Sequence, residues 1–161
     1  MSVALELVNP FIAAAAEVLR TETASEVKRG ALALERSNIT ATEVTTLLSL
    51  VGDVEGMVML GMSENTAKAI VSRMMGEEFS ELDELVQSGI GELGNVISGR
   101  AITKLSASGY TTDISVPTLI IGRGATVSTL DIQRLVVPLE ADFGLISLHL
   151  ALREKHNGHS G

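Results

Sequence analysis

Four residues in the middle of the chain combine useful chemistry with a helical spacing: Ser88, Glu92, Asn95 and Gly99. At about 100° per residue they fall on one face of a helix. The glutamate offers a charged acceptor, and the asparagine three residues later offers both donors and an acceptor. Because a carboxamide is a poor base, Asn95 can hold a water molecule but hardly takes up a proton. The pair therefore makes chemical sense only if a substrate supplies most of the catalytic groups.

The helix that carries these residues is predicted to run from Leu82 to Leu105. It contains four glycines. Each lowers the stability of a helix by about 1 kcal/mol relative to alanine, so we expect the glycines to have a role that offsets this loss. Gly91 and Gly99 border the polar residues and leave the helix surface bare enough for another molecule to approach. The alternative is that the glycines admit a neighbouring helix or sheet and the polar pair is merely solvated. The core-facing stripe on the other side is Leu82, Val86, Ile90, Leu93, Ile97 and Ala101.

The sequence gives little support for other kinds of functional site. The chain has no cysteine, which excludes thiol nucleophiles, disulfides and cysteine-based metal sites. The histidines are His149 in a predicted strand and His156 and His159 in the tail, a poor basis for a metal site or a Ser-His-Asp hydrolase. The glycines at 122–124 open no helix and precede no Lys-Ser or Lys-Thr pair, so they predict a turn rather than a nucleotide site. We expect no metal and no cofactor of the chain's own.

Charge and hydropathy narrow the partners further. A net charge of -8 argues against nucleic acid and anionic membranes as partners, because both bind to clusters of lysine and arginine. No apolar run approaches the roughly 20 residues that span a bilayer, and no cleavable signal pattern is present. The cytoplasm is the expected compartment.

Local patterns predict an α+β fold, an antiparallel sheet with helices packed on one face, because runs of helices and strands do not alternate and connections are short. Residues 1–155 are expected to form one domain and residues 156–161 a disordered tail. The predicted helices are Glu6–Arg20, whose regular part is expected to start near Pro10, Glu64–Met75, with Ser63 as N-cap, and Leu82–Leu105. The predicted strands are Val27–Glu35, Val44–Val51, Met57–Met62, Thr112–Val116, Leu119–Gly122, Leu130–Leu139 and Phe143–Leu152.

The segment LDELVQSGIGELGN, residues 82–95, with the glycine four residues beyond it, resembles the signature of the CheC/CheX/FliY family of chemotaxis phosphatases. The likeness to CheX-like members extends to Met74-Met75-Gly76, to Gly56-Met57 and to residues 113–123. It therefore covers most of the chain and implies a single CheX-like phosphatase domain over residues 1–155.

The resemblance also implies a function. The expected substrate is a phosphorylated CheY-type response regulator, a protein that carries an aspartyl phosphate and its own Mg²⁺. Glu92 would pair with the regulator's active-site lysine, and Asn95 would orient the attacking water. Ser88, Gly91 and Gly99 would contact this partner. Similarity to CheX further implies a homodimer formed through edge strands.

Some members of the family carry the motif on two helices, and the first predicted helix here contains Glu6-x-x-Asn9. Pro10 follows at once, and Ala13 stands where the motif has glycine. We therefore interpret Glu6 and Asn9 as residues of a helix start rather than as a second site.

Two other hypotheses use the same helix. A non-catalytic adaptor would bind and sequester a response regulator or a flagellar switch component. A purely structural dimer would use the glycines for packing, and it predicts that Glu92 and Asn95 are buried and mutually satisfied.

Overall fold

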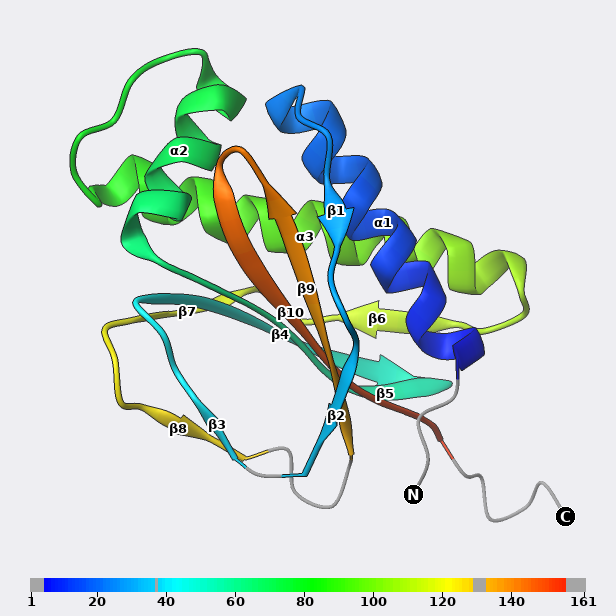
Figure 1. Cartoon of the computed structure of the whole chain (residues 1–161). Helices are drawn as coiled ribbons and strands as arrows, with labels where there is room; N and C mark the ends of the chain where they lie inside the picture. Colours follow the sequence, from blue (N-terminus) through cyan, green and yellow to red (C-terminus); the bar gives the residue numbers. More distant parts are fainter. Residues whose placement is uncertain (1–4, 37, 129–132, 156–161) are drawn as a thin grey trace, which may run out of the picture.

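The structure, a computed structural model, describes residues 5–36, 38–128 and 133–155. Its helices are α1 (Leu5–Thr23), α2 (Glu64–Met75) and α3 (Glu84–Ala107) (Figure 1). Its strands are β1 (Lys28–Arg29), β2 (Ala33–Glu35), β3 (Ile39–Thr40), β4 (Val44–Gly52), β5 (Val54–Met62), β6 (Thr112–Ile114), β7 (Thr118–Ile121), β8 (Thr126–Val127), β9 (Arg134–Ala141) and β10 (Gly144–Glu154).

Eight of the described strands form one antiparallel sheet in the order β1-β9-β10-β5-β4-β6, with β2 also paired to β9 and β7 also paired to β4. Two long hairpins, β4–β5 and β9–β10, make its centre. They are joined by the pairing of β5 with β10, in which Leu60 lies opposite Leu148. Among the described strands, β3 and β8 pair only with each other.

The three helices cover one face of this sheet (Figure 1). Alternation along the strands explains why: Leu48 and Leu50 of β4 are buried on the helix side, whereas Val51 is 64% exposed on the other. The predicted stripe of α3 supplies the opposing layer, with Ile90, Leu93 and other members fully buried. The structure thus confirms the predicted α+β class and the antiparallel sheet with helices on one face.

The expectation that the regular part of the first helix starts near Pro10 is wrong. α1 begins at Leu5, so Pro10 lies inside the helix and cannot donate a backbone hydrogen bond to the Glu6 carbonyl. Leu7 and Val8 in the preceding turn are at most 1% exposed. Their burial contributes about 1.5–3 kcal/mol each and offsets the lost hydrogen bond.

Strand boundaries also differ in places. The predicted strand 27–35 is divided into β1 and β2, and between them the Gly30 amide donates to the Pro138 carbonyl at 2.8 Å. β5 begins at Val54 rather than Met57, because a short turn after Gly52 is enough to reverse the chain. The two-residue strands β3 and β8 were not predicted, since so short a run carries no alternating pattern.

Part of the chain cannot be compared with its prediction. The strand predicted over Leu130–Leu139 corresponds to β9 from Arg134 onward, and its residues 130–132 lie outside the described residues. The predicted tail 156–161, with His156 and His159, also lies outside them. Within the described ranges, no helix has the length and apolar character needed to cross a membrane.

Candidate functional site

The polar stripe predicted from sequence lies on the outer surface of α3. The helix begins after Asp83, whose side chain accepts a hydrogen bond from the Val86 amide at 2.9 Å and caps the first turn. Because the apolar stripe faces the core, Ser88 and Glu92 are exposed and Asn95 is half-buried. The position of the apolar residues therefore orients the polar ones.

These side chains form one wall of an open groove of about 500 Å³. The opposite wall comes from Pro117 and Leu119, at the connection from β6 to β7 and in β7 itself. The sequence had not indicated them as site residues, nor Glu84 and Gln87, which also line the groove. Helical spacing could have identified Glu84 and Gln87. Each lies four residues before another residue that lines the groove, and therefore on the same face of the helix.

The four glycines of α3 serve different purposes. A Cβ atom added at Gly89 would lie 2.8 Å from a Val71 methyl of α2, and one at Gly94 would lie 3.0 Å from Leu48 of β4. These two glycines let α3 approach its neighbours closely, as the packing alternative proposed. At Gly99, by contrast, an added Cβ meets nothing within 4 Å. Packing explains two of the glycines but gives no reason for Gly99.

Gly91 differs from the sequence-based expectation of a bare surface. It is buried, and a Cβ atom there would lie 3.6 Å from Pro117 Cγ, an ordinary contact distance. The open part of the helix surface is therefore next to Asn95 and Gly99, while Gly91 lines the groove beside Pro117.

This contrast predicts opposite effects on stability. Gly99→Ala is expected to raise the free energy of unfolding by up to about 1 kcal/mol, because alanine is the better helix former and its methyl group meets no neighbour. Gly89→Ala is expected to lower it by about 1–2 kcal/mol, because overpacking against Val71 exceeds the propensity gain. Urea unfolding followed by circular dichroism measures both. Equal effects at the two positions would contradict this account of the glycines.

The two central side chains, Glu92 and Asn95, are not engaged by the part of the protein that the structure describes. Among the described residues, no hydrogen bond or ion pair joins the Glu92 carboxylate or the Asn95 carboxamide to another side chain. The buried, mutually satisfied pair that the structural-dimer hypothesis requires is absent from this part of the chain. Both groups are free to meet an incoming molecule.

The structure places no histidine of its described part in the groove. His149 lies on β10 and accepts a hydrogen bond from Arg134 Nε at 3.2 Å. Burial lowers the pKa of His149 to about 4, so the ring is neutral at pH 7. The described residues also contain no group of three or more side chains placed to hold a metal ion.

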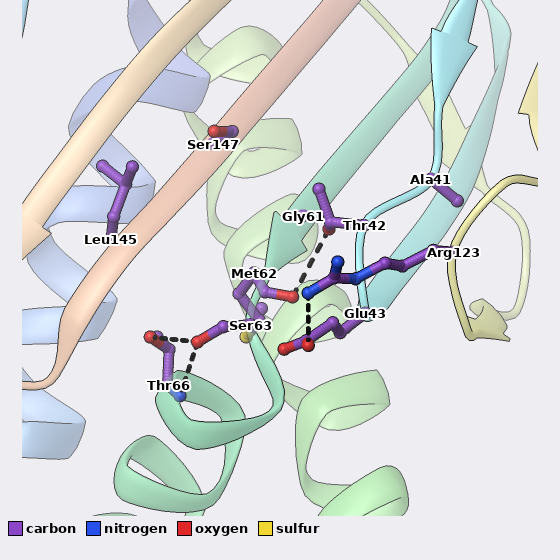
Figure 2. A pocket seen from close by; sticks show the side chains of 10 residues that line it. All are labelled: Ala41, Thr42, Glu43, Gly61, Met62, Ser63, Thr66, Arg123, Leu145 and Ser147. Atoms are coloured by element: carbon purple, nitrogen blue, oxygen red, sulfur yellow. Dashed lines mark hydrogen bonds and ion pairs between the residues drawn. The ribbon is translucent and has the colours of Figure 1, made fainter.

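A second cavity, of about 580 Å³, lies where β5 ends and α2 begins (Figure 2). Its charged groups are already paired with each other: Arg123 donates to Glu43 at 2.9 Å (Figure 2). The Glu64 amide also donates to Glu43 at 2.7 Å, and this backbone hydrogen bond, together with Arg123, lowers the pKa of the Glu43 carboxyl group. The cavity thus offers no free acid or base.

The second Glu-x-x-Asn sequence has a different setting. Glu6 on α1 accepts a hydrogen bond from the Tyr110 hydroxyl at 3.3 Å, and burial is the main cause that raises the pKa of that hydroxyl. The asparagine, Asn9, is exposed but is followed by Pro10 inside the helix. The groove on α3 remains the candidate site.

Comparison with known proteins defines the class first. The fold is similar to a crystal structure of a CheC-like superfamily protein from Shewanella sp. PV-4, with a TM-score of 0.85, 27% identity and coverage of 94% of this chain and 99% of that one. It is also similar to a CheX–CheY–BeF3–Mg²⁺ complex from Borrelia burgdorferi, with a TM-score of 0.79, 30% identity and coverage of 94% and 100%.

The sequence comparisons identify the family. Residues 44–140 match the model of the family described as chemotaxis phosphatase CheX. The chain is 33% identical over 156 residues to the CheY-P phosphatase CheX of Thermotoga maritima, covering 91% of this chain and 96% of that protein. This protein therefore belongs to the CheX family of chemotaxis phosphatases, which confirms the resemblance seen in its sequence.

Proposed function

We propose that this protein accelerates hydrolysis of the aspartyl phosphate of a CheY-type response regulator. The observation that carries the proposal is the unengaged Glu92 and Asn95 pair on the wall of an open groove. Its family membership and the CheX–CheY–BeF3–Mg²⁺ complex of a relative support the same substrate. The chain needs no cofactor of its own in this proposal, because Mg²⁺ belongs to the substrate protein.

The roles follow from what each group can do. The regulator presents its phosphoryl group, Mg²⁺ and lysine, and Glu92 pairs with that lysine to fix the docking geometry. Asn95 enters the regulator's active site and holds a water molecule in line with the phosphorus atom. The water oxygen attacks phosphorus, the bond from phosphorus to the aspartyl oxygen breaks, and the water proton leaves with the phosphate. The products are a free aspartate and inorganic phosphate.

The remaining residues of the stripe contribute contact surface. Ser88 is exposed one turn before Glu92, and Gly99 leaves open space one turn beyond Asn95. Gly91 contributes backbone surface to the groove beside Pro117, where an added Cβ atom would make only an ordinary contact. The Gly99→Ala variant is therefore expected to bind the phosphorylated regulator more weakly although it folds more stably.

Turnover tests the proposal against the adaptor hypothesis. Substoichiometric protein, for example one part to fifty of regulator phosphorylated with acetyl phosphate and freed of donor, is expected to release all of the phosphate. An adaptor would bind one equivalent and leave the excess regulator at its intrinsic rate of dephosphorylation. Phosphate release by a coupled assay separates these outcomes, and release at the intrinsic rate would refute the enzymatic proposal.

We further propose a homodimer formed through edge strands, and the cytoplasm as the compartment, as the substrate requires. The observation is that residues 28–35, which include β1 and β2, are exposed at the edge of the sheet, with Leu34 55% exposed. Sedimentation equilibrium should give twice the chain mass, and Leu34→Lys should give the single mass. A monomeric wild type would contradict the dimer without affecting the proposed reaction.

A further inference from the structure

The wall of the groove opposite α3 contains a β-bulge. Ile114 of β6 pairs with Leu50, and Thr118 of β7 pairs with Leu47. Three residues, 115–117, therefore lie opposite two residues, 48 and 49, of β4. Since Ser115 forms two hydrogen bonds with the backbone of Ser49, both at 2.9 Å, the extra residue falls at 116–117.

The bulge changes which way its side chains point. Ile114 lies opposite Leu50 and so shares the helix side of the sheet, and alternation returns Val116 to that side. Counting back from Leu119, which pairs with Thr46 on the helix side, places Pro117 on the same side. Two consecutive residues, Val116 and Pro117, thus face the helix side of the sheet instead of one, and Pro117 lines the groove.

Pro117 and Val116 have different environments there. Pro117 lines the groove next to Gly91. Val116 is 83% exposed, more than any other large apolar side chain among the described residues. Because single exposed apolar residues are common on protein surfaces, what distinguishes Val116 is its place next to Pro117 in the groove wall.

A second exposed apolar side chain, that of Leu85, lies near the start of α3. Leu85 is seven residues, or about two helical turns, before Glu92, so it continues the polar stripe toward the start of α3. It is 53% exposed. The neighbouring Glu84 lines the groove. On each side of the groove, one exposed apolar residue is therefore next in sequence to a lining residue: Leu85 follows Glu84, and Val116 precedes Pro117.

We propose that Leu85 and Val116 are the apolar anchors that bind the phosphorylated response regulator, leaving Glu92 and Asn95 to act on its active site. This inference rests on the proposed function, and it adds that different residues carry out binding and catalysis. The occupant is the regulator because each of the two residues directly adjoins, in sequence, a residue that lines the groove where the phosphoryl group would lie. Desolvated apolar anchors around a polar centre are the usual source of affinity in protein interfaces.

The test separates binding from turnover. Leu85→Ala and Val116→Ala are each expected to raise KM for the phosphorylated regulator about tenfold, with kcat within twofold of wild type, because the anchors bind ground state and transition state equally. The dissociation constant for the regulator activated with BeF3⁻, a phosphoryl analogue, should rise by the same factor. Isothermal titration calorimetry measures it without any turnover.

Matched controls exist elsewhere on the surface. Val51→Ala removes the same atoms from a valine that is 64% exposed, on the other face of the sheet, and Leu145→Ala does so for a leucine that is 46% exposed on β10. Both controls should keep wild-type KM and dissociation constant. If the Leu85 and Val116 variants match these controls while wild type turns over, the anchors are refuted and the proposed function stands.

Failure of the proposed function and failure of the anchor inference give different results. If wild type does not accelerate dephosphorylation, the proposed function fails, and the calorimetric dissociation constants alone decide the inference. Weaker binding by both anchor variants then supports a docking surface without catalysis, and unchanged or absent binding overturns it. A lowered kcat in either variant would also contradict the inference, because it would place that residue in the reaction rather than in docking.

Discussion

Replacing Asn95 with alanine is expected to reduce the stimulated rate of dephosphorylation by about a hundredfold or more while changing the affinity for the regulator by less than threefold. The carboxamide is half-buried at the groove wall and makes no hydrogen bond to another described side chain. Its proposed task is to hold the water in line with phosphorus, and loss of such a positioned group typically costs about 10²–10³ in rate. Single-turnover phosphate release at saturating enzyme measures the effect without interference from binding.

The chain supplies its own control for this variant. Like Asn95, Asn9 lies on a helix three residues after a glutamate, and its side chain is exposed. Asn9→Ala is expected to retain the wild-type rate. A large loss with Asn9→Ala would establish a second site on α1 and contradict our interpretation of Glu6 and Asn9 as structural residues. Wild-type activity in the Asn95→Ala variant would contradict the proposed mechanism.

Replacing Glu92 with alanine is expected to lower kcat/KM by at least tenfold and to weaken binding as well. The carboxylate is exposed in the free protein, but in the complex it would lie at the centre of the interface, paired with a lysine. Truncating one partner of a buried, hydrogen-bonded charge pair costs about 2–5 kcal/mol. Steady-state kinetics and calorimetry on the same preparation separate the two parts of the loss.

A double-mutant cycle identifies the partner of Glu92. When the regulator's active-site lysine is replaced by methionine, Glu92→Ala should cost little further binding, because the interaction is already lost. Glu78→Ala, at an exposed acidic residue between α2 and α3, controls for the general effect of removing a negative charge and should bind like wild type. Additive losses in the cycle would show that Glu92 does not contact that lysine.

The sequence was sufficient for features that depend on neighbours along the chain. Helical periodicity placed Ile90 in the core and Glu92 on the surface, because an amphipathic helix allows one orientation against a sheet. The cap of α2 was equally local: the Ser63 hydroxyl accepts from the Thr66 amide, and the helix ends at Gly76 in the left-handed conformation.

What only the tertiary structure decided involves residues far apart in the chain. The glycines of α3 look alike in sequence, yet Gly89 packs against Val71 while Gly99 meets no atom that could constrain it. Pro10 is tolerated inside α1 because burial of the residues before it outweighs one missing hydrogen bond. The facing wall of the groove depends on a bulge whose extra residue appears only when the pairing of β6 and β7 with β4 is known. Helical periodicity and helix caps depend on residues that are close together in the sequence. Distances between elements and the register of the strands depend on how the whole chain packs.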